Sequence, residues 1–184
     1  MQLSRKALNA RWAWTAGAAF AVLAALNLLE GVLRARTGFG TVDLQFVSSG
    51  WGIRVIMDHW VRPPDSVLAG FSLGLDFLFM PLYGAALFFG AIVALDRFAP
   101  RPGRLRRIMT LLAFAPVAAA ICDAIENALE LAMLNGGPTD ALARLALEAT
   151  AAKYAGIAIG LALSVAGLVG LYWKGSAKGA DPRT

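Results

Sequence analysis

Long apolar stretches separated by short charged clusters dominate the pattern of this chain. No charged residue occurs from Trp12 to Leu29, and three further predominantly apolar runs follow. A helix needs about 20 such residues to cross a bilayer core about 30 Å thick. The pattern therefore predicts a single all-α domain over residues 1–184. It is expected to be an integral membrane four-helix bundle with spans at about 12–34, 66–95, 108–134 and 140–173.

A secretory signal peptide is the alternative interpretation of the first run. Its apolar part is longer than the roughly 7 to 15 residues of a signal sequence. Glu30, Arg34 and Arg36 also follow at the place where a small-residue cleavage site should lie. These features favour a retained first transmembrane helix.

Lysine and arginine are distributed unevenly among the segments that flank the spans. The N-terminal segment, the connection between spans two and three, and the C-terminal tail carry most of them: Arg5, Lys6, Arg11, Arg97, Arg101, Arg104, Arg106, Arg107, Lys174, Lys178 and Arg183. The connection between spans three and four has none before Arg144. Because basic segments stay on the cytoplasmic side, both termini are predicted to be cytoplasmic.

The only long connection, residues 37–64, is predicted to lie outside and to contain a short amphipathic helix. Ser48 and Ser49 are suitable helix caps. Within the following stretch, one face gathers apolar side chains and the other gathers Arg54 and Asp58. The apolar face consists of Ile53, Ile56, Met57 and Trp60. Such a helix is expected to lie on the membrane surface.

Two roles remain open for this outer segment. It is either a simple connector, anchored at the membrane interface by Trp51 and Trp60, or a lid over a site. In the second case Trp51, His59 and Trp60 are the candidate lid residues. His59 is the only histidine, and no metal-ligand spacing surrounds it, so neither a metal nor a cofactor is expected.

Composition agrees with a membrane protein and argues against other classes. Hydrophobic residues make up 58% of the chain and charged residues only 16%, whereas about a quarter of a soluble domain is charged. The formal net charge is +5, but the basic residues form no stripe with interleaved aromatics, so no nucleic acid partner is expected. The expected partners are membrane lipid, a small amphipathic ligand, and further copies of the chain if it forms an oligomer.

Polar residues inside the spans lie at one depth. With a rise of about 1.5 Å per residue, counting from the cytoplasmic end of each span places them about 20 to 30 Å inward. Every span contributes to this layer, and its members are Asn27, Glu30, Asp76, Tyr83, Asp123, Glu126, Asn127 and Lys153. A carboxylate that faces lipid at the bilayer centre costs about 2.5 to 3.5 kcal/mol. We therefore expect these groups to face one another, or water.

Lys153 is the expected counter-charge for the acidic side chains of the layer. One ammonium cannot neutralise several carboxylates, so some should carry a proton, or a cationic or hydrogen-bonding ligand should complete the site. Arg34 is placed to pair locally with Glu30. The candidate ligand-binding or polar-network residues are Glu30, Asp76, Tyr83, Asp123, Glu126, Asn127 and Lys153. Glu130 and Glu148, near the outer ends of their spans, are expected to be solvated.

These residues also carry a resemblance. The motif Asp76-Phe77-Leu78-Phe79 with Tyr83, then Asp123-x-x-Glu126-Asn127, then Ala151-Ala152-Lys153, resembles a group of small uncharacterised bacterial four-span membrane proteins. This resemblance implies a multi-pass protein of the bacterial inner (plasma) membrane and no particular activity. The chain is more loosely similar to sterol-isomerase and sigma-2-receptor-like membrane proteins, from which the spacing of its acids departs.

Three functions fit the sequence. The first is a pocket toward the outer side that binds or transfers a small amphipathic or lipid-like ligand. The second is an intramembrane acid–base enzyme of isomerase type, in which Glu126 and Asp123 move a proton on a lipid-like substrate. The third is an accessory or structural subunit whose polar network only stabilises the fold.

Overall fold

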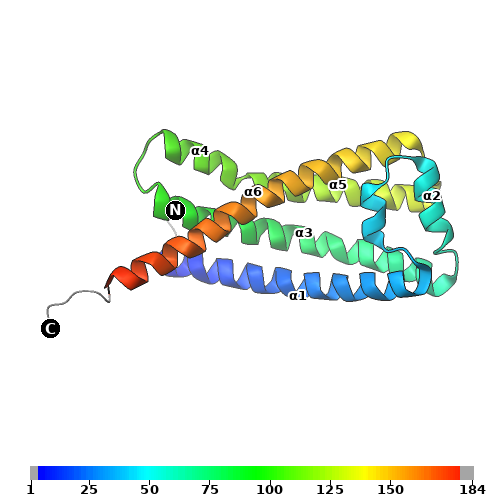
Figure 1. Ribbon diagram of the computed structural model, residues 1–184, viewed down its shortest axis with the longest axis horizontal. Coiled ribbons are helices and arrows are strands. Elements are labelled where there is room, and N and C mark those ends of the chain that lie inside the picture. Colours follow the sequence, from blue (N-terminus) through cyan, green and yellow to red (C-terminus); the bar gives the residue numbers. More distant parts are fainter. Residues whose placement is uncertain (1–3, 179–184) are drawn as a thin grey trace.

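The computed structural model describes residues 4–178, with side chains for 4–170, and all regular secondary structure in that part is helical. No strand occurs in that range. In chain order the elements are α1 (Arg5–Thr37), η1 (Thr41–Phe46, a 3₁₀ helix), α2 (Gly50–Asp58), α3 (Pro63–Phe98), α4 (Arg104–Ala113), α5 (Ala115–Gly136) and α6 (Asp140–Lys178) (Figure 1). The side chains of Lys174 and Lys178, and all of Arg183, lie outside the described part.

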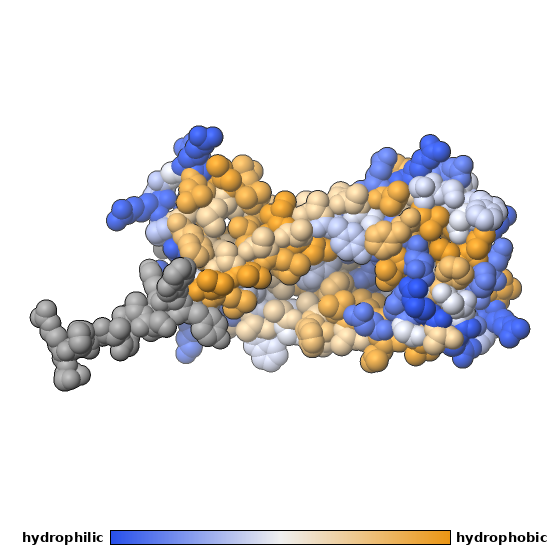
Figure 2. Space-filling view, in the orientation of Figure 1, coloured by the Kyte–Doolittle hydropathy of each residue, from blue (hydrophilic) through white to orange (hydrophobic). Residues whose placement is uncertain are grey.

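Four helical segments are long and apolar enough to cross a membrane. They are α1, α3, α4 together with α5, and α6 as far as Gly170. Large hydrophobic side chains such as Trp14, Leu28 and Leu111 point outward, with 71 to 80% of their surface exposed. Figure 2 shows the apolar surface between two polar ends. An apolar surface of this extent suits a lipid environment and not water. The predicted all-α bundle with four long apolar helices is confirmed.

Helix α3 is the centre of the bundle. It packs against α1, α5 and α6, and α5 also packs along α6. Helix α1 packs mainly on α3 and buries few of its own residues. Helices α1 and α6 thus flank the same face of α3 without forming a main contact with each other.

Glycines let α6 approach its neighbours closely. A Cβ at Gly156 would lie 2.6 Å from the carbonyl oxygen of Ala115, and one at Gly160 would lie 3.0 Å from Leu87. Small residues spaced four apart in a span predict close helix approach, and at Gly156 and Gly160 that approach occurs inside the bundle. Gly70 and Gly74 have the same spacing, but a Cβ at either position would meet nothing within 4 Å.

The third span is broken between α4 and α5. Pro116 has no N–H group for the carbonyl of Leu112, and its ring clashes with that carbonyl in a regular helix. The chain tightens just before it, where the N–H of Phe114 donates to the carbonyl oxygen of Leu111 at 3.1 Å. Pro81, by contrast, lies within α3 without ending it.

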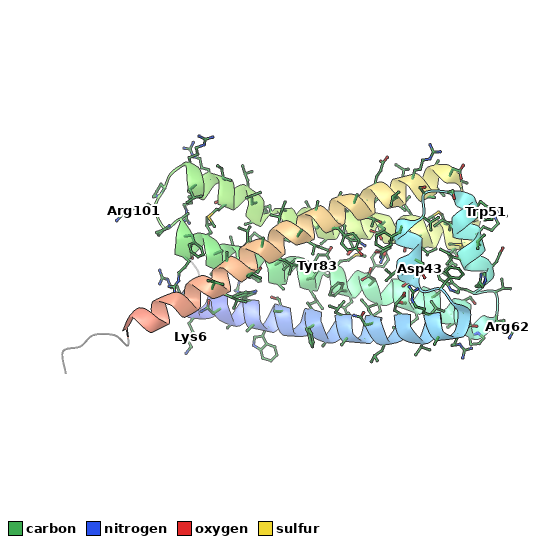
Figure 3. The ribbon with its side chains drawn as sticks, viewed as in Figure 1. Lys6, Asp43, Trp51, Arg62, Tyr83 and Arg101 are labelled. Atoms are coloured by element: carbon green, nitrogen blue, oxygen red, sulfur yellow. The ribbon has the colours of Figure 1, made fainter. Side chains whose placement is uncertain are left out.

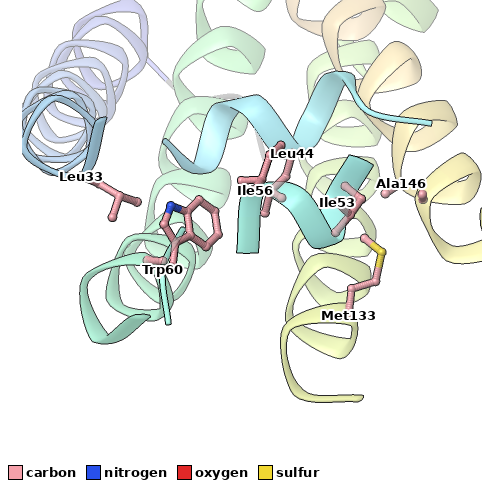
Figure 4. Packing of buried hydrophobic residues seen from close by; sticks show 9 residues of the cluster. Leu33, Leu44, Ile53, Ile56, Trp60, Met133 and Ala146 are labelled. Atoms are coloured by element: carbon pink, nitrogen blue, oxygen red, sulfur yellow. The ribbon is translucent and has the colours of Figure 1, made fainter. Parts of the chain in front are cut away.

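The connection between α1 and α3 closes the end of the bundle opposite the termini. Ser49 caps α2, as predicted, by accepting a hydrogen bond from the N–H of Gly52 at 3.2 Å. The predicted amphipathic helix is confirmed, but its apolar face lies inward. It packs with residues of η1, α1, α5 and α6 in a cluster that contains Leu33, Leu44, Ile53, Ile56, Trp60, Met133 and Ala146 (Figure 4).

Trp60 differs from its predicted role as a membrane-interface anchor, because it is only 1% exposed. Its indole N–H donates to the carbonyl oxygen of Phe39 at 3.3 Å. Trp51, in contrast, is 76% exposed and remains available to the interface. The cluster of Figure 4, together with η1 and α2, forms a cap on this end of the bundle. The ring of Trp60 is buried in this cap because the ends of four helices offer an apolar surface there.

Candidate functional site

An ion-paired group joins α5 to α6 inside the bundle. The ammonium of Lys153 lies 3.1 Å from Oδ1 of Asp123, 2.9 Å from Oε1 of Glu126 and 2.7 Å from Oε2 of Glu126. All three residues are at most 4% exposed. The three donors of the ammonium therefore have three nearby carboxylate oxygens, in the low-dielectric setting where such contacts are strongest.

Helix α3 contributes two further polar contacts to this layer. The hydroxyl of Tyr83 donates to Oδ2 of Asp123 at 3.0 Å, so both oxygens of that carboxylate have partners. One turn toward the outer end, the amide Nδ2 of Asn127 donates to Oδ2 of Asp76 at 2.8 Å. Asp76 is only partly buried, and its partner is neutral.

Glu30 stands apart from this group, although it lines the same cavity. Its carboxylate accepts from Arg34 at 2.9 Å, as predicted. It also accepts from the backbone N–H and the hydroxyl of Thr41, at 2.8 and 3.1 Å. Gly40 lies directly against that carboxylate, where a Cβ would clash. Glu30 therefore holds η1 onto α1 and does not contact Lys153.

A cavity of about 220 Å³ lies between α1 and α6, over the face of α3. Among the predicted site residues, those that line the cavity are Glu30, Asp76, Asp123, Asn127 and Lys153. Asn27, Thr41 and Gln45 complete its polar wall. Its apolar wall includes Leu23, Leu26, Phe79 and Ile157. Leu23 on α1 and Tyr154 on α6 are 40% and 44% exposed, so the cavity reaches the lateral surface of the bundle. Tyr83 lies near the middle of the bundle, and Asp43 of η1 lies nearer the end that the outer connection closes (Figure 3).

The candidate lid residues do not line this cavity. His59 is exposed and packs its ring edge-on against Phe39, with ring centroids 4.9 Å apart. The lining from the outer connection comes instead from η1, through Thr41, Val42 and Gln45. A lid role for Trp51, His59 and Trp60 stays a prediction.

Reasoning from sequence missed two residues that line the cavity, Gln45 and Tyr154. The hydroxyl of Tyr154 donates to Oε1 of Gln45 at 2.9 Å, and its ring stacks on Phe46 with centroids 6.1 Å apart. The Nζ of Lys153 lies 5.1 Å from the centre of the Tyr154 ring. These contacts fasten η1 to α6 across the cavity. Tyr154 follows Lys153 directly, which is the signal that could have drawn attention to it.

Glu130 corrects an expectation from the sequence. It is 0% exposed, not solvated, and neither of its carboxyl oxygens has a hydrogen-bond partner among residues 4–170. Glu148 is exposed, as expected. Burial of an unpartnered carboxyl group is unfavourable in any protein and more so in a membrane. We therefore expect Glu130 to lower the stability of the fold. Glu126, one turn away, should raise it through its ion pair with Lys153.

The same substitution at these two positions should have opposite effects. Glu130→Met should raise the free energy of unfolding by about 1 to 3 kcal/mol, because it removes an unsatisfied polar group. Glu126→Met should lower it by about 1.5 to 3 kcal/mol, because Lys153 loses a charged partner. Unfolding by denaturant in uncharged detergent measures both. Equal losses at the two positions would show that Glu130 has a stabilising partner.

Comparisons with known proteins identify no relative, so the function is inferred from the geometry of the site. No protein-family model matches the chain, and neither the curated proteins nor the solved structures contain a match. Within the described residues, no group of three histidine, cysteine, aspartate or glutamate side chains is arranged to hold a metal ion. The resemblance to four-span bacterial proteins stays a prediction.

Proposed function

We propose that this membrane protein binds a small amphipathic or lipid-like ligand in the cavity between α1 and α6. The observation that carries the proposal is the division of the cavity wall. Asp76, Asn127 and Lys153 offer polar groups to the cavity. Leu26 lies one turn from Glu30 on α1, and Ile157 lies one turn from Lys153 on α6, both toward the end of the bundle with the termini, where they offer an apolar surface. A ligand with a polar head and an apolar tail matches both parts.

Cavity size supports a ligand that is only partly enclosed. The cavity has a volume of about 220 Å³, which gives room for a small headgroup. The tail then leaves between Leu23 of α1 and Tyr154 of α6, both of which are partly exposed. Polar groups within a span are costly when they face lipid, and a bound headgroup satisfies those at the cavity wall.

Blocking the apolar part of the cavity tests this proposal. Ile157→Trp should fill the tail path, whereas Val169→Trp, on the same helix at a position 51% exposed, adds the same ring outside the cavity. Native mass spectrometry of protein purified without added lipid should find about one small molecule per chain. We expect it to be lost from Ile157→Trp and kept in Val169→Trp. An empty wild-type protein, or equal retention in both variants, would refute the proposal.

We also infer that both termini face the cytoplasm of a bacterium and that η1 and α2 face outward across its inner membrane. The support is the charge at the end of the bundle where α1 begins. Among the described residues at that end, Asp96 is acidic and many are basic: Arg5, Lys6, Arg11, Arg97, Arg101, Arg104, Arg106 and Arg107. Such segments remain on the cytoplasmic side.

Cysteine labelling tests this orientation. In a Cys122→Ala background, a membrane-impermeant maleimide added to intact spheroplasts should label Ser48→Cys and should not label Gly103→Cys. Both positions are exposed, so access to the reagent depends on the side of the membrane alone. Labelling of Gly103→Cys before lysis would reverse the assignment.

A further inference from the structure

Some of the acidic side chains along the cavity wall form ion pairs, and one does not. Three carboxyl-bearing residues, Glu30, Asp76 and Asp123, line it together with one ammonium, that of Lys153. Glu30 is paired with Arg34, and Asp123 with Lys153. Within the described residues, Asp76 has no ion pair, and its recorded partner is the neutral amide of Asn127. The carboxyl group of Asp76 therefore stands at the cavity wall without an ion-paired cation among the described residues.

Asn127 adds a second unsatisfied acceptor beside Asp76. Its Nδ2 donates to Asp76 and, at 3.4 Å, to the carbonyl oxygen of Leu73. The amide oxygen Oδ1 is buried and has no partner among the described residues, although Asn127 is 0% exposed and lines the cavity. Turning the amide over would place that oxygen against the Asp76 carboxylate, so the orientation is fixed by charge.

Lys153 cannot readily serve an anionic headgroup. Its ammonium already contacts three carboxylate oxygens at 2.7 to 3.1 Å. An anion in the cavity would have to draw Lys153 away from Asp123 and Glu126 while facing Asp76. Besides the hydroxyl of Ser72, which can donate or accept, the available groups near Asp76 are hydrogen-bond acceptors: its own carboxyl oxygens and Oδ1 of Asn127.

We propose that the cavity selects an amphiphile with a protonated primary amine as its head, and that this ammonium binds at Asp76 beside Asn127. A primary ammonium offers three N–H donors to acceptors that lack them, whereas a quaternary ammonium offers none. The headgroup of an aminophospholipid and a free alkylamine share this chemistry. The inference rests on the proposed function and narrows it to one class of ligand.

Four decyl amphiphiles that differ only in their heads test the selection. Decylamine, decyltrimethylammonium, decanol and decanoate are offered at equal concentrations, below micelle formation, to the full chain in uncharged detergent. We expect decylamine to bind about tenfold or more tightly than each of the other three, because it alone donates charged hydrogen bonds to acceptors. Decanoate should bind most weakly. A parallel arm with lysophosphatidylethanolamine shows whether the amine of a lipid is accepted as well as a free one.

Asp76→Asn should reduce decylamine binding about tenfold or more. Asp96→Asn is the matched control, since Asp96 lies on the same helix outside the cavity and pairs with Arg106. Thermal unfolding of both variants shows that they are folded. Equal binding of all four heads, preference for decanoate, or an unaffected Asp76→Asn would overturn the inference and leave the proposed function standing. If no probe binds, the proposed function itself fails.

Discussion

Lys153→Met should lower the free energy of unfolding by about 3 to 5 kcal/mol, the range measured when one partner of a buried ion pair is removed. The ammonium lies within 3.1 Å of Asp123 and 2.7 Å of Glu126, and the lysine side chain is only 5% exposed. Methionine fills a similar volume, so the loss comes from two carboxylates left without a counter-charge. Unfolding by denaturant in uncharged detergent measures the change.

Two controls separate charge from packing in that experiment. Arg144→Met, at an exposed position on the same helix, should change the unfolding free energy by less than about 0.5 kcal/mol. Adding Glu126→Met to Lys153→Met should recover part of the loss, because one uncompensated carboxylate is removed. If Lys153→Met alone were as stable as the wild type, the buried pair would not exist in solution.

Trp60→Ala should be as damaging, at about 3 to 5 kcal/mol, because it empties a large space in the cap. The ring is 1% exposed and lies in the cluster that fixes η1 and α2 to the bundle. Since η1 lines the cavity, the variant should also lose the retained ligand. Thermal unfolding and native mass spectrometry measure the two effects.

Trp51→Ala is the matched control for Trp60→Ala. Its ring is 76% exposed, so its removal should change stability by less than about 0.5 kcal/mol and leave ligand retention intact. Equal effects of the two substitutions would mean that the side chain of Trp60 is not buried inside the protein when it is in the membrane.

Sequence alone predicted the helices well because a bilayer imposes a simple length requirement. Apolar runs of the right length had to be spans. The sequence Asn135-Gly136-Gly137-Pro138 is typical of a helix stop, and Gly137, with φ +88°, does follow the end of α5. The inward face of α2 was not predictable in the same way. Apolar periodicity reveals that a face is covered, but not whether lipid or protein covers it.

The polar layer was predictable in depth but not in detail. Counting residues placed Asp123, Glu126 and Lys153 at one level, and they are in contact. Glu130 was predicted wrongly because its depth suggested water, whereas the fold leaves it 0% exposed. Glu30 was grouped with the others by depth, yet the local turn formed by η1 holds its carboxylate.

The central claim is that carboxylates and an amine from separate spans meet inside the membrane. Solid-state NMR of the protein in lipid bilayers tests it through the dipolar coupling between lysine Nζ and the carboxyl carbons of aspartate and glutamate. The Lys153 signal, identified by its loss in Lys153→Arg, should show strong coupling to both Asp123 and Glu126, whose oxygens lie 3.1 and 2.7 Å away. Coupling no stronger than that of Lys6 at the N-terminus would contradict the claim.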